Sequence, residues 1–155
     1  MSGVPVDVID HLAGIAPGSA IATIRDGRMQ ARENAQNSFL ALFAPDEARD
    51  MGMDERFAVA AFVCALHGDG AARLFYADRL PTMLAGAVAD AAARGAGHGP
   101  YGSYPSPALA RENAPGTTFT LSAAARTAMG ARLASAQHIS RACARLAWMT
   151  PPSSM

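Results

Sequence analysis

The feature that most constrains the fold is an apolar segment near the middle of the chain, residues 55–66. Alanines there separate five large apolar side chains, which cover nearly every side of a helix: Phe57, Val59, Phe62, Val63 and Leu66. A helix that is hydrophobic around its whole circumference is a buried one. We therefore expect all five side chains to be buried, each contributing up to about 1.5–3 kcal/mol to folding.

Residues that favour helix ends flank this segment. Asp54 is a good N-cap residue, and Gly68 and Gly70 around Asp69 predict a tight turn after the helix. A second helix is predicted over residues 71–80. Residues 54–80 are therefore expected to form a helical hairpin, which we call the core hairpin.

The rest of the chain also favours helices. Half of its 155 residues are hydrophobic, largely alanine, which favours close-packed helices over sheet. Further helices are expected at residues 6–13, 20–26, 29–43, 82–94 and from residue 121 onwards. The prediction is an all-α single domain of about six to seven helices over residues 1–150, with residues 151–155 as a tail.

The apolar pattern also predicts which way some side chains point. Ile21, Ile24 and Met83 are expected to face the core, and Arg32 is expected on the outside of its helix. Residues 95–119 interrupt the pattern with five glycines and four prolines, which predicts a long irregular loop before the last helix. Loops of this length within compact domains are usually functional or disordered.

Charge and cysteine content exclude several classes of protein. The formal net charge is zero, so nothing indicates a nucleic acid or a membrane as a partner. All thirteen basic residues are arginine, which we interpret as the coding bias of a GC-rich bacterial genome. Cys64 and Cys143 lie far apart, and no signal peptide or long apolar run is present. We therefore expect a cytoplasmic protein with reduced thiols.

Several separate blocks of sequence resemble one known group of proteins. They are DVIDHLAGIAPGS at residues 7–19, ARENAQNSFLALFAP at residues 31–45, the core hairpin, and GPYGSYPSP at residues 99–107. In this order they resemble the "CMD domain protein" branch of the carboxymuconolactone decarboxylase/alkylhydroperoxidase (AhpD-like) superfamily. The resemblance covers roughly residues 6–135 and implies an AhpD-like helical fold and a homo-oligomer. A redox homologue is a further partner that we consider.

The chain departs from this superfamily where its peroxidatic members carry their chemistry. Those members have a Cys-x-x-Cys pair, a histidine four residues beyond it and an upstream glutamate, which together supply a reactive thiolate, a resolving thiol and a proton relay. With residues 65–68 aligned, the two cysteine positions fall on Asp69 and Ala72, the histidine on Tyr76 and the glutamate on Phe57. The chain has no Cys-x-x-Cys anywhere, so dithiol peroxidase activity is rejected.

The C-terminal end departs from the resemblance as well. Members of the branch continue for some tens of residues after the segment that resembles residues 132–135 here. In this chain no carboxylate follows Glu112, although four arginines do. We interpret the end after Ser135 as native and divergent, truncated or frameshifted.

The core hairpin carries the first candidate site. Cys64 and His67 are three residues apart and share a helix face, and Asp69 lies in the following turn. They could form a thiolate with a histidine base and an acidic orienter. The alternative is a buried cysteine that acts as a small hydrophobe and a histidine that suits a helix C-terminus. A metal site of the form Cys-x-x-His-x-Asp would have three ligands without a fourth, and no metal or cofactor is expected.

The second candidate site lies in the irregular loop. His98, Tyr101 and Tyr104 could line a ligand pocket, close to Tyr76 if the loop folds back. The alternative is a loop whose aromatic residues pack at a subunit interface.

A third group, near the N-terminus, is expected to have no ligand. His11 shares a helix face with Asp7 and Asp10, and we interpret this face as a solvated surface rather than a metal site.

The leading interpretation is a non-peroxidatic, catalytically inactive AhpD-like protein that acts as a ligand-binding or interaction module. The alternative is an enzyme of the decarboxylase or lactone-handling type, in which Cys64, His67 or Tyr76 supplies proton transfer. A third interpretation is the product of a pseudogene.

Overall fold

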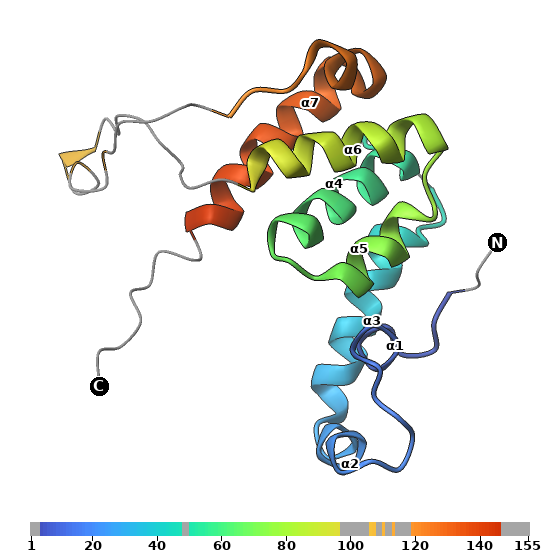
Figure 1. Ribbon diagram of the computed structural model, residues 1–155. Coiled ribbons are helices and arrows are strands. Elements are labelled where there is room, and N and C mark those ends of the chain that lie inside the picture. The colour runs from blue at the N-terminus through green and yellow to red at the C-terminus, as the bar shows by residue number, and fades with distance from the viewer. Residues whose placement is uncertain are drawn as a thin grey trace. The chain divides into compact units, whose positions relative to one another are not determined.

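The computed structural model describes residues 4–47, 50–96, 106–107, 110, 113 and 119–146, with side chains as far as residue 136. All regular elements in this part of the chain are helices, seven of them α-helices (Figure 1). The all-α prediction of six to seven helices is therefore confirmed. The chain divides into two compact units, Met1–Phe57 and Ala58–Met155, which we call unit 1 and unit 2 and describe separately.

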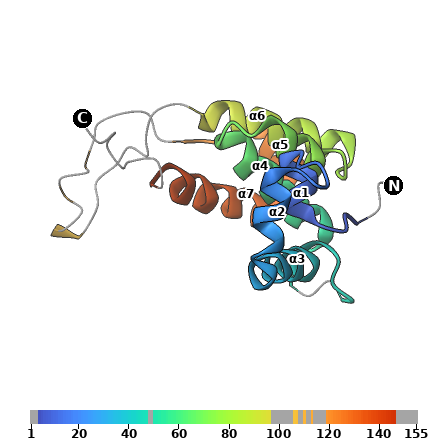
Figure 2. The ribbon, with the colours of Figure 1, turned by 90° about the horizontal axis from the view of Figure 1, so that it is seen from below.

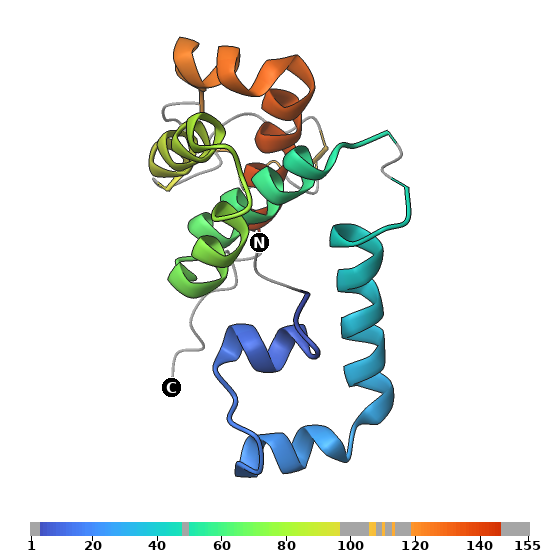
Figure 3. The same ribbon diagram turned by 90° about the vertical axis from the view of Figure 1, so that its right-hand side faces the viewer.

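Unit 1 contains three helices whose ends follow the cap signals of the sequence. They are α1 (Val8–Ala13), α2 (Ala20–Asp26) and α3 (Met29–Phe43), and the last two have the predicted bounds. The Asp7 carboxylate accepts a hydrogen bond from the Asp10 N–H, so α1 starts two residues later than predicted. Figure 3 shows α1 above α2, both running sideways, with α3 standing upright beside them; α3 contacts both helices.

The end of α1 needs glycine for its conformation. Gly14 has a φ of 63°, the left-handed conformation that costs least for glycine. The Gly14 N–H donates to the carbonyl of His11, and the Ile15 N–H donates to the carbonyl of Asp10 at 2.9 Å. This pair of bonds is a Schellman motif, and it turns the chain back towards α2.

Two predicted orientations in unit 1 are wrong. Ile21 and Ile24 of α2 are 58% and 63% exposed, because this short helix turns Ala22 and the partly buried Arg25 inward instead. Arg32 of α3, expected outside, reaches the carboxylates of α1. The interior of unit 1 is therefore partly ionic.

The helix α4 (Met53–Leu66) begins in unit 1 and continues into unit 2. The predicted cap at Asp54 is wrong, because Asp54 lies within the helix. Gly52 precedes the first turn instead: its carbonyl accepts from the Arg56 N–H at 3.1 Å, and its N–H donates to the Glu55 carboxylate at 2.8 Å. The Glu55 carboxylate therefore satisfies a backbone N–H that the helix start leaves without a partner.

The turn after α4 is the one that the glycines predict. Gly68 has a φ of 74°, its N–H donates to the carbonyl of Ala65, and the Asp69 N–H donates to the carbonyl of Cys64 at 3.0 Å. Asp69 then caps α5 (Gly70–Ala77) by accepting from the Ala72 N–H at 2.9 Å. This second helix ends three residues before its predicted end.

Two longer helices complete unit 2, α6 (Thr82–Gly95) and α7 (Ala123–Leu146), and they pack against each other. Figure 2 shows both from below. The core of the unit is built from alanines and a few large residues of α4, α6 and α7 together with the segment before α7. Its buried members are Ala58, Ala61, Phe62, Val88, Ala91, Ala92, Leu121, Ala125, Met129, Leu133 and Ala134.

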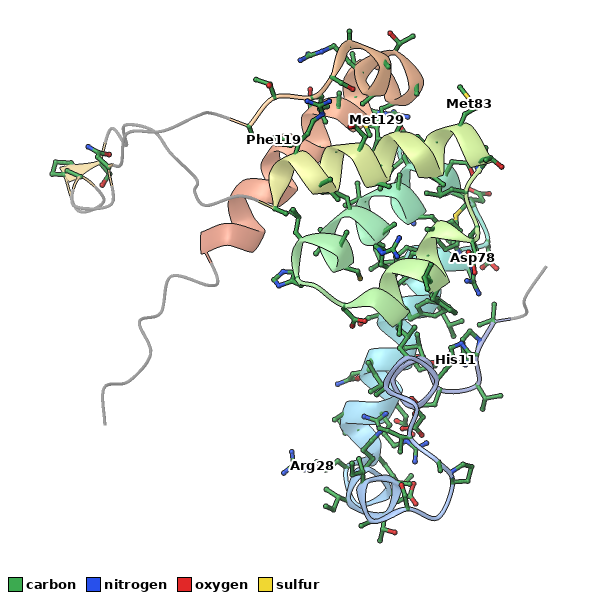
Figure 4. All side chains as sticks on the ribbon, in the orientation of Figure 1. His11, Arg28, Asp78, Met83, Phe119 and Met129 are labelled. Atoms are coloured by element: carbon green, nitrogen blue, oxygen red, sulfur yellow. The ribbon has the colours of Figure 1, made fainter. Side chains whose placement is uncertain are left out.

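Phe62 is the one large side chain of α4 that is fully buried, and its ring centroid lies 6.1 Å from that of Phe119. The expectation that all five large residues of the segment are buried is wrong, because α4 turns its alanine face inward at Ala58 and Ala61. The prediction for Met83 is also wrong: it is 81% exposed, near the start of α6 (Figure 4).

The last helix is interrupted. Gly130 has φ 71° and ψ 167°, which lies outside the helical region, so α7 is two helical segments joined at this residue (Figure 3). Other residue types scarcely adopt this conformation. A Cβ at Gly130 would meet no other atom within 4 Å, so the backbone conformation alone requires the glycine.

Candidate functional site

The core hairpin brings together three of the predicted site residues. Cys64 lies near the end of α4 and Tyr76 lies on α5, and both side chains are half-buried. Burial raises the pKa of the Cys64 thiol, and the negative charge of Asp69 raises it further. Burial also raises the pKa of Tyr76, and its proximity to Cys64 adds to this effect. Both groups therefore carry their protons at neutral pH.

This environment differs from that of a reactive cysteine. Nucleophilic and redox-active cysteines have a lowered pKa, which positive neighbours or a helix N-terminus produce. Cys64 lies at a helix C-terminus, with a carboxylate as the neighbour that acts on its charge. The thiol is thus suited to packing and to weak hydrogen bonding.

The other two members of the predicted triad sit in the turn between the helices. Asp69 uses one carboxylate oxygen to cap α5, which gives it a structural role that the sequence analysis did not consider. His67 is exposed and follows the last residue of α4. A role for either residue in catalysis stays a prediction.

The face of α5 near Tyr76 carries a contact that the sequence did not indicate. The guanidinium of Arg79 lies 3.7 Å from the centre of the Phe75 ring, and its Nη1 donates to the carbonyl of Phe75. The rings of Phe75 and Tyr76 meet edge to face at 5.1 Å. The positive charge of Arg79 lowers the pKa of Tyr76, opposing the effect of burial.

The loop residues of the second candidate site, His98, Tyr101 and Tyr104, lie outside the described residues. Their proposed pocket, and its closeness to Tyr76, therefore stay predictions. Within the described ranges no group of three or more histidine, cysteine or acidic residues is arranged to hold a metal ion.

Unit 1 contains a charge cluster that the sequence analysis missed. Asp7 and Asp10 of α1 face Arg25 of α2 and Arg32 of α3, with nitrogen–oxygen distances of 3.0 Å and 2.6 Å to Arg25 and of 3.0 Å and 3.0 Å to Arg32. Arg32 also donates to Asp26. The interpretation of the α1 carboxylates as a solvated surface is wrong, because the two guanidinium groups cover them.

The cluster favours the ionised form of Asp7. Burial alone would raise the pKa of this carboxyl group. The hydrogen bonds from the Asp10 N–H and from Arg32, and the positive charge of Arg25, outweigh burial and hold the pKa below its usual value. Each of the two carboxylates, Asp7 and Asp10, lies 15 to 25 positions in sequence from the arginines that it contacts, so no short motif indicates the cluster.

A hollow of about 420 Å³ lies beside this cluster. Its polar lining is Asp7, Asp10, His11, Asp26 and Arg32, and its apolar lining includes Ile15 and Ala22. His11 lies on α1 (Figure 4). The carboxylates of Asp7 and Asp10 in this lining already accept hydrogen bonds from Arg25 and Arg32.

Comparison with known proteins adds no relative to these observations: no family model matches the chain, and neither a curated protein nor a solved structure is significantly similar to it. No helix of the described residues is long and apolar enough to cross a membrane.

Proposed function

We propose that this chain is a non-peroxidatic, AhpD-like helical module that acts by binding other proteins, in the first place further copies of itself, in a bacterial cytoplasm. The observation that carries this proposal is the outward face of α2. Ile21 and Ile24 lie three residues apart, so they share one face of the helix, and both are more than half exposed. The outward side of a surface helix is normally polar. Apolar side chains grouped there are typical of a contact surface.

The chemistry of the core hairpin supports the non-peroxidatic part of the proposal. The chain has no Cys-x-x-Cys pair that would place a resolving thiol next to Cys64. Burial and Asp69 raise the pKa of Cys64 and keep it as a thiol, whereas attack on a peroxide requires a thiolate.

A second candidate function is proton transfer of the decarboxylase or lactone-handling type. The closeness of Tyr76 and Cys64 favours it, because both groups keep their protons at neutral pH and the phenol hydroxyl can donate to a substrate oxygen. Tyr76→Phe would abolish such an activity, and it would leave self-association unchanged. These two effects separate the two candidates.

Sedimentation velocity tests the leading proposal. We expect the wild-type protein to sediment as a species heavier than its monomer mass of 16.0 kDa, and the Ile21→Ser/Ile24→Ser double variant to shift towards the monomer. Met83→Ser is the matched control, since it removes an exposed apolar side chain from unit 2. Circular dichroism checks that the helices remain. A monomeric wild type, or a double variant that associates like wild type, would refute the proposal.

A further inference from the structure

The two units of the chain are stabilised in different ways. In unit 2, buried side chains from three helices form one apolar cluster. Among the described residues of unit 1, the buried hydrophobic side chains are Val8, Ala22 and Phe39. Burial of a large apolar side chain contributes roughly 1.5–3 kcal/mol, and fixing the backbone of each residue costs about 1–2 kcal/mol. So small an apolar core gives unit 1 little stability of its own.

Phe43 of α3 stacks on Phe57 of α4 at 5.2 Å, but the links that join α1 to α2 and α3 are polar. The Asp7 carboxylate contacts Arg25 of α2 and Arg32 of α3, and the Asp10 carboxylate contacts the same two arginines. Each carboxylate therefore holds α1 to both other helices at once. The other charged or titratable groups on these elements that face the cluster or line its hollow are Asp26 and His11.

A side-chain amide adds a second polar link between α1 and α3. The Gln36 side chain accepts from the Val8 N–H at 2.8 Å and donates to the carbonyl of Pro5 at 2.9 Å. These bonds satisfy backbone groups at the start of α1, which the helix itself leaves without partners. They break together with the charge cluster when α1 leaves α3.

We propose that the Asp7–Asp10–Arg25–Arg32 cluster is an ionic latch, and that unit 1 opens cooperatively when the latch is lost while unit 2 stays folded. Proteins open locally in contiguous units whose opening free energies range from near zero to that of global unfolding. A unit with a small apolar core belongs to the low end of that range. The latch sets how often α1, α2 and α3 separate. The hollow, and the arrangement that turns Ile21 and Ile24 outward, exist only while the three helices are packed together.

Hydrogen exchange of the full chain, read by mass spectrometry, tests this proposal. In the wild-type protein we expect the amides of α1–α3 to exchange with a common opening free energy that is lower than that of α6 and of residues 123–136. Asp7→Asn keeps an oxygen that can cap α1 and removes the charge. The cluster is only partly exposed, so removing its ion pairs should destabilise unit 1 more than the loss of a surface pair and less than the loss of a buried pair. We therefore expect the exchange rate of the amides in α1–α3 to rise roughly 10- to 100-fold.

The matched control is Asp90→Asn, which removes a carboxylate paired with Arg94 within α6 of unit 2. It should leave exchange in α1–α3 unchanged. The proposal is overturned if wild-type α1–α3 exchange no faster than α6, if Asp7→Asn leaves their exchange unchanged, or if it speeds both units equally. If Asp7→Asn fails to fold, hydrogen exchange of the wild-type protein in increasing urea tests the proposal instead. We expect α1–α3 to open separately from unit 2, and a single opening event shared by both units would overturn the proposal.

Discussion

Asp69 connects the stability of the core hairpin with the chemistry of Cys64, and two substitutions separate these roles. Its carboxylate caps α5 through the Ala72 N–H at 2.9 Å, and its charge raises the pKa of Cys64. Asp69→Asn keeps an oxygen that can accept the capping bond but removes the charge. Asp69→Ala removes both.

The expected magnitudes follow from these contacts. Loss of an N-cap costs about 0.5–2 kcal/mol, so Asp69→Ala should lower the free energy of unfolding by that amount, whereas Asp69→Asn should lower it little. Both variants remove a negative neighbour, so the pKa of Cys64 should fall in both. A lower pKa gives a larger thiolate fraction at a given pH, and alkylation by iodoacetamide should become faster.

The assay uses a Cys143→Ser background, so that Cys64 alone reacts. Alkylation rates are measured as a function of pH, and urea unfolding gives the stability. Asp78→Asn is the control, because Asp78 is an exposed carboxylate of the same helix that is not among the charges acting on Cys64. The reasoning is refuted if Asp69→Asn leaves the pH dependence of alkylation unchanged, or if Asp69→Ala is as stable as Asp69→Asn.

Three further predictions concern stability. Phe62→Ala, at a fully buried position, should cost about 3–5 kcal/mol in urea unfolding, and Leu74→Ala, at a half-exposed position, about 1 kcal/mol or less; similar losses would contradict the assigned core. Gly130→Ala should lower the free energy of unfolding by about 1–3 kcal/mol, because alanine scarcely adopts the backbone conformation of this residue. Gly86→Ala, within α6 and with open space around its Cβ, should raise the free energy of unfolding by about 0.5–1 kcal/mol. A stabilising Gly130→Ala would argue for an unbroken α7. The pKa of Asp7 is lowered in the folded protein, so its ionisation stabilises the fold above the usual carboxyl pKa, and this stability is lost as the pH falls through the lowered value. The free energy of unfolding should therefore fall less steeply with decreasing pH in Asp7→Asn than in wild type. Equal slopes would contradict the role of the cluster.

The sequence predicted the helices well where local chemistry determines their ends. Ser19 and Gly27 flank α2, and Gly68 ends α4 in the left-handed conformation that its position requires. Such signals lie within a few residues of the helix end that they specify. The interruption at Gly130 was missed, because an apolar pattern that continues on both sides of a glycine does not distinguish a continuous helix from two joined segments.

Side-chain orientation was harder to predict. Hydropathy assigns Ile21 and Ile24 to the core. In the structure α2 turns Arg25 inward instead, because Arg25 forms ion pairs with two carboxylates at α1. That pairing joins residues far apart in the chain, and only the arrangement of the three helices brings them together. A rule based on hydropathy alone therefore fails wherever a partly buried ion network replaces apolar packing.

The candidate site illustrates the same limit. The spacing of Cys64, His67 and Asp69 was visible in the sequence. In the structure Asp69 is close enough to raise the pKa of Cys64, and Cys64 is close enough to Tyr76 to raise the pKa of that residue. Spacing carries no information about burial, and burial is the larger cause of the raised pKa of Cys64. The direction of that shift separates a packing thiol from a reactive one.

Turnover of an organic hydroperoxide, measured in the presence of a dithiol reductant, tests the non-peroxidatic account most directly. The wild-type protein and Cys64→Ser are compared at neutral pH, with each variant checked for helical content and for its sedimentation. The account predicts that both consume hydroperoxide at the rate of the reductant alone. Turnover by the wild type that disappears in Cys64→Ser would show that Cys64 reacts as a thiolate, and would contradict the account.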